Sequence, residues 1–407
     1  MAISLGVSIV SLVIWVYLLL FRGQFWRTDQ HLEALDAEGN DALNPQETPE
    51  CSAPPVCVVI PARNEADVLP ITLRSLFTQD YDGALDVLVV DDHSTDGTAT
   101  VAQQTVQDLG KADHFQLYSA QPLPPGWTGK LWALDQGTQQ VMGRSPAPTY
   151  ILLSDADIQH DSHNLRRLVT KAEAQSLDLA SVMVRLRCES LAEHWLIPAF
   201  VFFFQKLYPF RWVNQPERKT AAAAGGCVLL RTSALQRIGG IASIREALID
   251  DCTLAQHVKH GDPTANSALE SHPIWLGLSS KTYSLRPYPN LKTIWDMVAR
   301  TAYTQLNYSP LLLLGTLLGM VLVYLVAPIA LIGGLLSHSP LIALIGAATW
   351  GLMAIAYSPM VRFYQCSPLY AVALPVIALL YTLMTLDSAL RHWQGRGGSW
   401  KGRTYSP

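Results

Sequence analysis

Between Tyr308 and Val361 the chain contains no lysine, arginine, aspartate or glutamate. A soluble segment of this length needs charged side chains on its surface, since soluble domains carry ~25 % charged residues. The whole chain of 407 residues has 15 % charged and 49 % hydrophobic residues. Because about 20 apolar helical residues cross the ~30 Å hydrocarbon core of a bilayer, the stretch predicts membrane spans. A polar break at 337–340 divides it into two spans, at 310–336 and 341–361.

Two further segments are apolar enough to enter a membrane. Residues 369–386 form a third C-terminal candidate. Residues 2–21 carry no charged side chain, and they lack the basic start and AxA-type cleavage site of a signal peptide. We therefore interpret 2–21 as an uncleaved anchor. Arg22 and Arg27 follow it, so the positive-inside rule predicts an outside N-terminus and a cytoplasmic position for the next domain.

The end of the chain is basic, with Arg391, Arg396, Lys401 and Arg403. One N-terminal and three C-terminal spans put this tail outside, against the positive-inside rule. Two interpretations stay open: one segment is re-entrant, or a short tail tolerates the opposite side.

Two other segments differ in composition from their surroundings. Residues 28–54 are polar and proline-containing, which is typical of a linker. An apolar stretch over 195–213 predicts either an in-plane helix at the membrane surface or a buried core helix. The sequence thus divides into an N-terminal transmembrane anchor at 1–27, a linker at 28–54, a globular domain at 55–307, a transmembrane region at 308–390 and a basic tail at 391–407.

Charge and cysteine content exclude some partners. The net charge is −4, with 29 basic and 33 acidic residues, which gives no support for a nucleic-acid surface. The six cysteines show no CxxC or zinc-type spacing, so reduced thiols are favoured over disulfides.

The globular domain alternates apolar runs with helical patterns. Continuous apolar runs at 56–60 and 150–153 are typical of strands buried on both faces, and 86–90, apolar after Asp86, is expected to be another strand. Helical patterns at 65–79 and 130–141 lie between them, and a further helix is expected after Asp96, its plausible N-cap. This βαβαβ succession predicts an α/β fold with a Rossmann-like, mostly parallel sheet.

Acidic residues follow three of the predicted strands, where parallel sheets bind ligands. Asp91 and Asp92 end one strand, Asp155 and Asp157 end another, and Glu65 follows the first. Converging carboxylates repel unless a cation lies between them, and Mg²⁺ or Mn²⁺ prefers such oxygen ligands. Neither a GxGxxG nor a GxxxxGK[ST] motif is present.

The motifs together resemble family 2 glycosyltransferases with the GT-A fold. The matching segments are 61–65 (PARNE), 90–97 (VDDHSTDG), 129–134 (GKLWAL), 155–157 (DAD), 225–227 (GGC) and 249–251 (IDD). With the terminal apolar segments and the ending SWKGRTY at 399–405, the chain is similar to the branch containing ceramide glucosyltransferases and hopene-associated glycosyltransferases. Residues 300–306 look more like the hopene-associated group.

The resemblance implies a role for each matching residue. Asp92 would accept a hydrogen bond from the uracil N–H. Pro61, Arg63, Glu65 and Asp91 would line the same nucleotide pocket, and Lys130 would add a positive charge. Asp155 would contact the ribose or metal, and Asp157 would hold the Mg²⁺ or Mn²⁺ that bridges the diphosphate. Gly225 and Gly226 would let the backbone approach the sugar, and Asp251, beside Asp250, would be the general base.

One departure from the family pattern concerns the region ahead of the C-terminal spans. Many members carry QxxRW or RxxRW there, whereas this chain has Arg300 without an Arg-Trp pair. Arg300 remains a candidate diphosphate ligand because its guanidinium can pair with a phosphate in bidentate fashion. The missing pair weakens an interpretation as a processive polysaccharide synthase.

These features predict a metal-dependent, inverting glycosyltransferase of the bacterial inner membrane, with its catalytic domain in the cytoplasm. It would move one sugar from a nucleotide-sugar donor, a UDP-sugar, to a hydroxyl of a lipid in the bilayer, with a hopanoid-type lipid suggested by the resemblance. Three alternatives stay open: a polyprenyl-phosphate sugar transferase, a processive glycan synthase, and a catalytically silent scaffold that binds sugar nucleotides.

Overall fold

The computed structural model describes residues 2–36, 53–261, 271–396, 399–400 and 403–404. The chain separates into two compact units. The helical unit contains residues 1–29, 187–211 and 287–407, and the sheet unit contains 30–186 and 212–286. Each unit is therefore discontinuous in sequence. The short helix α7 (Phe210–Val213) contains one of the points at which the chain passes from one unit to the other.

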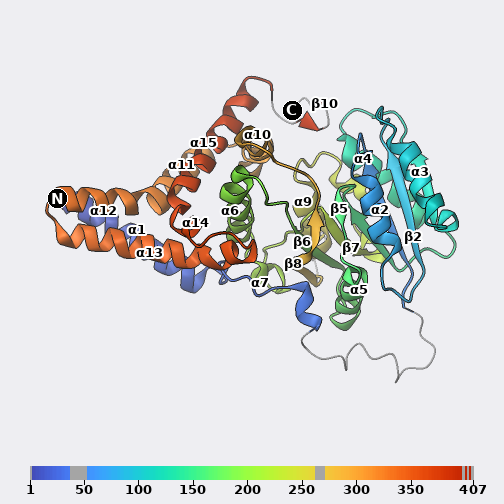
Figure 1. Ribbon diagram of the computed structural model, residues 1–407, viewed down its shortest axis with the longest axis horizontal. Helices are drawn as coiled ribbons and strands as arrows, with labels where there is room; N and C mark the ends of the chain where they lie inside the picture. Colours follow the sequence, from blue (N-terminus) through green and yellow to red (C-terminus); the bar gives the residue numbers. More distant parts are fainter. Residues whose placement is uncertain (1, 37–52, 262–270, 397–398, 401–402, 405–407) are drawn as a thin grey trace. The chain divides into compact units, whose positions relative to one another are not determined.

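An eight-stranded sheet, in the order β3-β2-β1-β4-β7-β6-β8-β5, is the centre of the sheet unit (Figure 1). Its strands are β1 (Val56–Ala62), β2 (Leu85–Asp91), β3 (Phe115–Ser119), β4 (Tyr150–Ser154), β5 (Ile158–Gln159), β6 (Leu179–Arg185), β7 (Cys227–Arg231) and β8 (Ile274–Ser284). Four of the seven pairings are parallel, and β7 runs antiparallel to both β4 and β6. The sheet is thus mixed beyond β4, a region for which the sequence analysis specified no strands.

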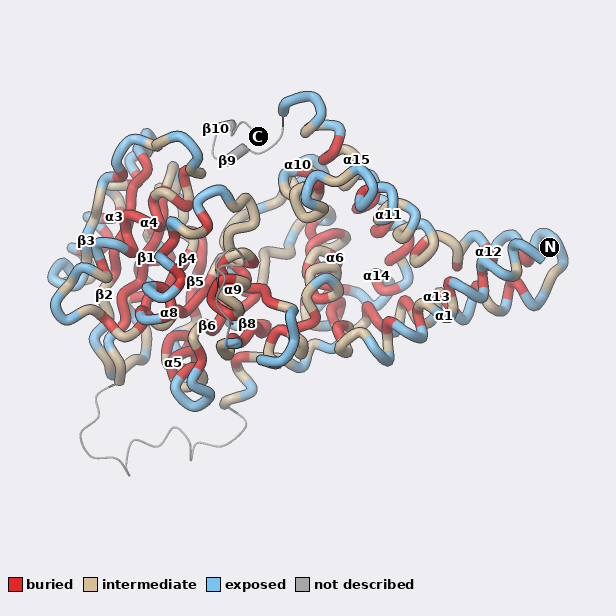
Figure 2. The backbone as a smooth tube through the Cα atoms, turned by 180° about the vertical axis from the view of Figure 1, so that it is seen from behind, coloured by how far each residue is buried: buried red, intermediate tan, exposed pale blue. Residues whose placement is uncertain are grey.

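Helices connect and cover these strands. They are α2 (Leu69–Phe77), α3 (Thr98–Asp108), α4 (Gly129–Met142), α5 (Asn164–Ala174), α8 (Thr232–Arg237) and α9 (Asp250–His260), with 3-10 turns η1 (Leu32–Asp36), η2 (Ala112–His114) and η3 (Ile241–Ile244). Figure 2 shows β1 and β4 in the buried core, and every residue of both strands is buried. The continuous apolar runs thus form strands that are shielded on both faces, as predicted.

Two predicted helix starts differ in detail from the structure. The helix expected over 65–79 begins at Leu69, with Pro70 in its first turn, where proline is tolerated because the N–H it lacks has no helical partner. The N-cap of α3 is Gly97 rather than Asp96, with a φ of 89°. Asp96 still bonds the first turn, since its Oδ1 accepts the Thr98 N–H at 3.0 Å.

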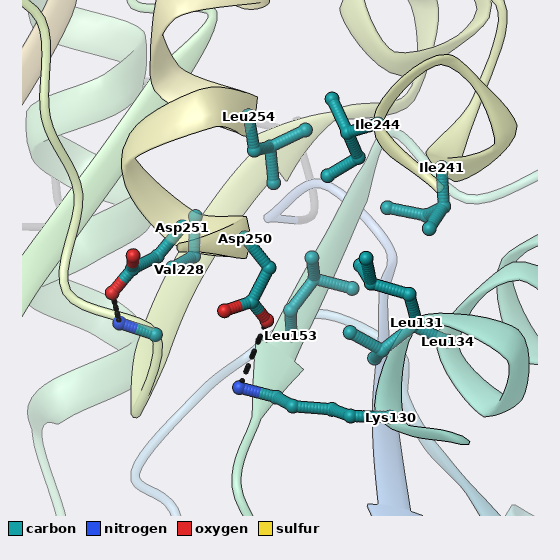
Figure 3. Close-up of a pocket in the computed structure, with 11 residues that line it drawn as sticks. Lys130, Leu131, Leu134, Leu153, Val228, Ile241, Ile244, Asp250, Asp251 and Leu254 are labelled. Atoms are coloured by element: carbon teal, nitrogen blue, oxygen red, sulfur yellow. Dashed lines mark hydrogen bonds and ion pairs between the residues drawn. The ribbon is translucent and has the colours of Figure 1, made fainter. Parts of the chain in front are cut away.

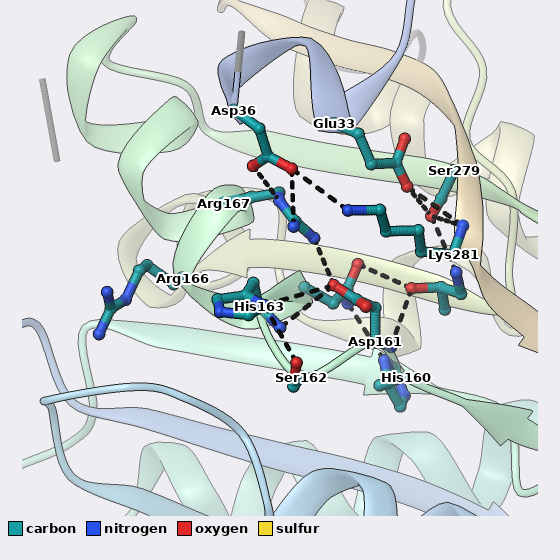
Figure 4. Close-up of polar contacts among 12 residues, drawn as sticks. Glu33, Asp36, His160, Asp161, Ser162, His163, Arg166, Arg167, Ser279 and Lys281 are labelled. Atoms are coloured by element: carbon teal, nitrogen blue, oxygen red, sulfur yellow. Dashed lines mark hydrogen bonds and ion pairs between the residues drawn. The ribbon is translucent and has the colours of Figure 1, made fainter. Parts of the chain in front are cut away.

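The first part of the predicted linker is held against the sheet unit. Asp36 pairs with Arg167 through two contacts, of 2.7 and 2.9 Å (Figure 4). Glu33 Oε1 accepts hydrogen bonds from the Ser279 hydroxyl at 2.6 Å and the Ser280 N–H at 3.0 Å. Leu32, which precedes Glu33, is buried. Residues 37–52, the greater part of the predicted linker, lie outside the described residues.

The helical unit contains four helices that are long and apolar enough to cross a membrane, at Ala2–Phe21, Pro310–Leu336, Pro340–Phe363 and Leu374–Trp393. Its elements are α1 (Ala2–Phe21), α6 (Leu191–Leu207), α10 (Leu291–Thr301), η4 (Thr304–Leu306), α11 (Pro310–Met320), the π-helical turn η5 (Val321–Leu325), α12 (Val326–Leu336), α13 (Pro340–Phe363), α14 (Leu369–Val372), α15 (Leu374–Trp393), β9 (Ser399–Trp400) and β10 (Arg403–Thr404). Helices α1, α12 and α13 lie side by side (Figure 1).

Two features of this unit refine the sequence analysis. The π-helical turn interrupts the 310–336 span, and the indole of Trp15 donates to the Val323 carbonyl there at 2.7 Å. A partner of this kind is needed because backbone groups in hydrocarbon have no water to bond. The apolar stretch around 195–213 forms α6, which packs against α13, α15 and α10.

Candidate active site

Four charged side chains meet at one end of the sheet unit's central strands, and Figure 3 shows three of them, Lys130, Asp250 and Asp251. Lys130 lies in the first turn of α4, Asp155 directly follows β4, and Asp250 and Asp251 open α9. The Nζ of Lys130 lies 3.1 Å from Asp155 Oδ1 and 3.1 Å from Asp250 Oδ2. The structure thus brings together residues that are as much as 121 positions apart, and one lysine faces three carboxylates.

The shared lysine does not neutralise this group. Burial by itself would lower the pKa of Lys130, but the charges of Asp155, Asp250 and Asp251 outweigh burial and raise it, so the lysine stays positive. The pKa of Asp155 is raised by burial and by the charges of Asp157 and Asp250, against the effect of Lys130. An excess of negative charge therefore remains, which favours a further cation or a proton.

Asp251 is held in a fixed orientation. Its Oδ2 accepts the Gly225 N–H at 2.9 Å, and its Oδ1 accepts the Cys252 N–H at 2.7 Å. Burial and the neighbouring Asp250 raise its pKa to about 6, although Lys130 and the two N–H groups act in the opposite direction. A carboxylate of this pKa is ionised near neutral pH and is still basic enough to accept a proton, which suits a general base.

The two glycines that precede β7 have different neighbours. A Cβ at Gly225 would lie 3.3 Å from Lys130 Nζ and 3.4 Å from Asp251 Oδ2. A Cβ at Gly226 would instead lie 3.2 Å from the Ile158 side chain. Gly225 therefore keeps open the space between the lysine and the carboxylate, whereas Gly226 packs against the core.

One wall of the pocket around these charges is apolar. Aliphatic side chains from α4, β4, β7, η3 and α9 line the same pocket as Asp250 (Figure 3). They are Leu131, Leu134, Leu153, Val228, Ile241, Ile244 and Leu254. The pocket therefore has charged side chains on one side and aliphatic side chains on the other, a combination suited to a substrate with a polar and an apolar part.

The predicted nucleotide-binding residues lie at the ends of β1 and β2. Pro61 is in β1 and pairs with Val90 of β2. Arg63 donates from Nη1 to the Asp92 carbonyl at 2.5 Å and lies 3.6 Å from Asp92 Oδ2. Asp91 accepts the Ser94 N–H at 3.3 Å, and both aspartates are buried. The sheet thus places the side chains at adjacent strand ends, while their contact with a nucleotide stays a prediction.

Arg286 is a site residue that the sequence analysis missed. Its Nε lies 2.8 Å from Asp157 Oδ2 and its Nη2 lies 3.1 Å from Glu65 Oε1. It therefore joins the ends of β1 and β4, two places where acidic residues were predicted to converge. Arg286 follows β8, a strand that the sequence analysis did not identify. One signal could have found it: Glu65 and Asp157, acidic residues after two neighbouring strands, had no basic partner assigned to them, and converging carboxylates require one.

Asp155 and Asp157 have the chemistry of a divalent-metal site. Their carboxylates are hard oxygen donors at the end of one strand, close enough for the charge of Asp157 to raise the pKa of Asp155. Each also has a basic partner, Lys130 for Asp155 and Arg286 for Asp157. The donor set fits Mg²⁺ or Mn²⁺, which would add to these two cations in balancing the charge.

Arg300, the remaining predicted site residue, lies in α10 of the helical unit. Its predicted contact with a diphosphate stays a prediction.

Comparison with known families matches residues 57–239 to the model described as glycosyl transferase family 2. The chain carries a family 2 glycosyltransferase domain. The matched residues include the ends of β1, β2 and β4 with Lys130, Gly225 and Gly226. Asp250, Asp251 and Arg286 lie beyond them, so the geometry of the site, rather than this match, places these three residues beside the others.

The chain is similar to solved structures of glycosyltransferases. Mannosyltransferase PcManGT from Pyrobaculum calidifontis, in complex with GDP-Man and Mn²⁺, is 15 % identical, with a TM-score of 0.51 over 96 % of this chain and 99 % of that one. Glucosyl-3-phosphoglycerate synthase from Mycobacterium tuberculosis, in complex with Mg²⁺ and UDP, is 18 % identical over 68 % of this chain and 81 % of that one, with a TM-score of 0.39. None of the curated proteins compared matches the chain. The α/β GT-A fold with terminal apolar helices, predicted from the sequence, is confirmed.

Proposed function

We propose that this glycosyltransferase is a membrane enzyme that transfers one sugar from a UDP-sugar to a hydroxyl group of a lipid, with inversion at the anomeric carbon. The observation that supports this most directly is Asp251, a carboxylate with a raised pKa that is fixed by the Gly225 N–H beside Lys130. Sugar transfer to a neutral hydroxyl needs a base, because the free hydroxyl has a pKa far above 7.

The proposed step is a single displacement. Asp251 accepts the proton of the acceptor hydroxyl while its oxygen forms a bond to the anomeric carbon. The bond from that carbon to the diphosphate oxygen breaks on the opposite face, and the nucleoside diphosphate leaves. Lys130 lies between Asp155 and Asp250, where its positive charge stabilises the negative charge that develops on the leaving group.

Mg²⁺ or Mn²⁺ held by Asp155 and Asp157 would supply further charge stabilisation at the diphosphate. Arg286 keeps the carboxylate of Asp157 oriented through its contact of 2.8 Å. Asp92, with Arg63, Pro61, Glu65 and Asp91 nearby, is proposed to receive the uracil ring at the ends of β1 and β2, and Arg300 remains a proposed diphosphate ligand.

Two observations favour a lipid acceptor. The pocket beside Asp250 and Asp251 has an aliphatic wall, and four helices are apolar enough to span a bilayer. An acceptor resident in the membrane presents its hydroxyl at the interface with its hydrocarbon part attached. The resemblance to hopene-associated glycosyltransferases makes a hopanoid-type lipid the first acceptor to test. Arg22 and Arg27 after α1 support a cytoplasmic sheet unit, and a bacterial inner membrane is the location that we propose.

The direct experiment is incubation of the purified protein with a panel of UDP-sugars and total membrane lipid. We expect mass spectrometry to detect a lipid that carries one added hexose, formed only when a divalent cation is present. NMR of that product should show the anomeric configuration opposite to that of the donor. A ladder of products would contradict single transfer in favour of a processive synthase, and product formed on a lipid phosphate would contradict a hydroxyl acceptor. Donor binding without any product would favour a scaffold.

A further inference from the structure

A cluster of three soft metal ligands lies in the helical unit, apart from the carboxylates described above. Among the residues that the structure describes, Cys188, His194 and Cys366 form a group whose ligand atoms all lie within 4.8 Å of one another. The two sulfurs are 3.8 Å apart. The first two residues are six positions apart and Cys366 is much later in the chain, so the spacing of the three residues matches no metal-binding sequence motif.

Defined helix ends hold all three residues. Cys188 and His194 flank the start of α6, where a capping box fixes the chain: the Ser190 hydroxyl accepts the Glu193 N–H at 3.1 Å, and Glu193 Oε2 accepts the Ser190 N–H at 2.7 Å. Cys366 follows α13, and its N–H donates to the Val361 carbonyl at 3.0 Å. The cluster is therefore attached to rigid elements, which a preformed metal site requires.

Aromatic packing supports the position of the histidine. The ring of His194 stacks on that of Tyr370, with centroids 6.3 Å apart and an interplanar angle of 14°. Tyr370 belongs to α14, the helix that follows Cys366. The same connection between α13 and α15 thus contributes one sulfur ligand and the ring that orients the imidazole.

We propose that Cys188, His194 and Cys366 bind a Zn²⁺ ion. Two thiolates on a tetrahedral zinc ion, each about 2.3 Å from the metal, stand about 3.8 Å apart. This is the separation of the two sulfurs here. A disulfide needs a sulfur–sulfur distance of about 2.05 Å and would require the segments to move together. Two sulfurs and one imidazole nitrogen select a soft or borderline ion rather than the Mg²⁺ or Mn²⁺ of the carboxylate site.

Three protein ligands leave the fourth zinc position open to water or to another ligand. The ion would join the segment ahead of α6 to the connection between α13 and α14, which are far apart in sequence. Because the metal binds only when these segments are assembled, it would stabilise the folded helical unit. The proposal is independent of sugar transfer, since none of the three residues belongs to the sheet unit.

Cobalt is the probe of choice, because Co²⁺ in a tetrahedral thiolate site is coloured and zinc is not. The full chain, purified in detergent, would be reduced, stripped with a chelator and titrated with Co²⁺. We expect one equivalent to bind with a thiolate-to-cobalt charge-transfer band, and Zn²⁺ to displace it. Cys188→Ser and Cys366→Ser should abolish the band, and His194→Ala should weaken binding at least 10-fold. Cys57→Ala, which removes a buried thiol from β1 of the sheet unit, should leave the titration unchanged.

The wild-type titration tests the proposal even where a variant fails to fold. Reduced wild-type protein that gives no thiolate charge-transfer band overturns it. A band that persists in the Cys188→Ser/Cys366→Ser double variant also overturns it, because the metal then lies elsewhere. Added Zn²⁺ should raise the melting temperature of the wild type and of Cys57→Ala, but not that of the double variant.

Discussion

The guanidinium of Arg286 lies 2.8 Å from the carboxylate of Asp157, the second acidic residue after β4. The same side chain reaches Glu65 at 3.1 Å, so one cation bridges two strand ends. Only 6 % of the Asp157 side chain and 11 % of that of Glu65 are exposed. Two nearly buried carboxylates therefore share one arginine, with a metal ion proposed to share the charge of Asp157.

Arg286→Met should destabilise the protein, because it leaves two poorly hydrated carboxylates without their cation. We expect the free energy of unfolding to fall by about 2–4 kcal/mol, measured by denaturant titration in detergent. Mg²⁺ should restore part of this loss, since the proposed ion binds the carboxylate of Asp157. Arg166→Met is the matched control: Arg166 also bridges two aspartates, Asp80 and Asp82, but these are 46 % and 73 % exposed, so the loss should stay below about 1 kcal/mol. Equal losses in the two variants would contradict the argument.

Asp251→Asn should abolish transfer without unfolding the protein. Asparagine keeps the size of the side chain and one oxygen that accepts the Gly225 N–H, but it cannot take up the proton of an acceptor hydroxyl. We expect kcat to fall by about 10²–10⁴-fold, with unchanged binding of the UDP-sugar in calorimetry. Asp250→Asn should cost less, because Asp250 acts through its pairing with Lys130. If the Asp251→Asn enzyme turned over faster than the Asp250→Asn enzyme, Asp250 rather than Asp251 would be the base.

The rate of transfer should rise with pH through about 6. Asp251 must be ionised to act as a base, and burial together with the charge of Asp250 holds its pKa at about 6, above the usual value of 3.8. Below this pH the folded enzyme carries a protonated Asp251, so kcat/KM should fall tenfold for each pH unit. In Asp250→Asn the neighbouring negative charge is absent, and the acidic limb should move to lower pH. A pH profile of kcat/KM for the two proteins measures this shift, and an unmoved limb would exclude Asp251 as the titrating group.

The sequence predicts those elements of this molecule that a continuous stretch of residues encodes. The apolar runs of β1, β2 and β4 and the charge-free segments at 2–21 and 310–361 are continuous patterns, so they were found with nearly correct ends. The third C-terminal candidate, 369–386, was placed less accurately, because α15 covers Leu374–Trp393 and includes charged residues. The pairing of β7 between β4 and β6 depends on contacts distant in sequence, and no local pattern encodes it. Arg286 was missed for the same reason, because its partners Asp157 and Glu65 come from other strand ends. The Cys188, His194 and Cys366 cluster was invisible because its spacing matches no motif.

Gly225→Ala should impair transfer while leaving the fold almost intact. The added methyl group would lie 3.3 Å from Lys130 Nζ and 3.4 Å from Asp251 Oδ2, so it enters the space between the cation and the base. Lysine has a flexible side chain that can move aside, which limits the cost to stability but displaces the charge from its place between Asp155 and Asp250. Because small displacements of catalytic groups are costly, we expect kcat to fall by about 10²-fold.

Gly226→Ala is the neighbouring comparison. Its methyl group would lie 3.2 Å from Ile158 and 3.4 Å from Val184 in the core, and no charged group is among its nearest neighbours. Overpacking of this kind costs about 1–3 kcal/mol of stability, so Gly226→Ala should lower the melting temperature. The transfer rate, measured well below that temperature, should change little. The two adjacent substitutions thus separate the loss of rate from the loss of stability. If Gly225→Ala kept full activity, the space between Lys130 and Asp251 would not be where the sugar reacts.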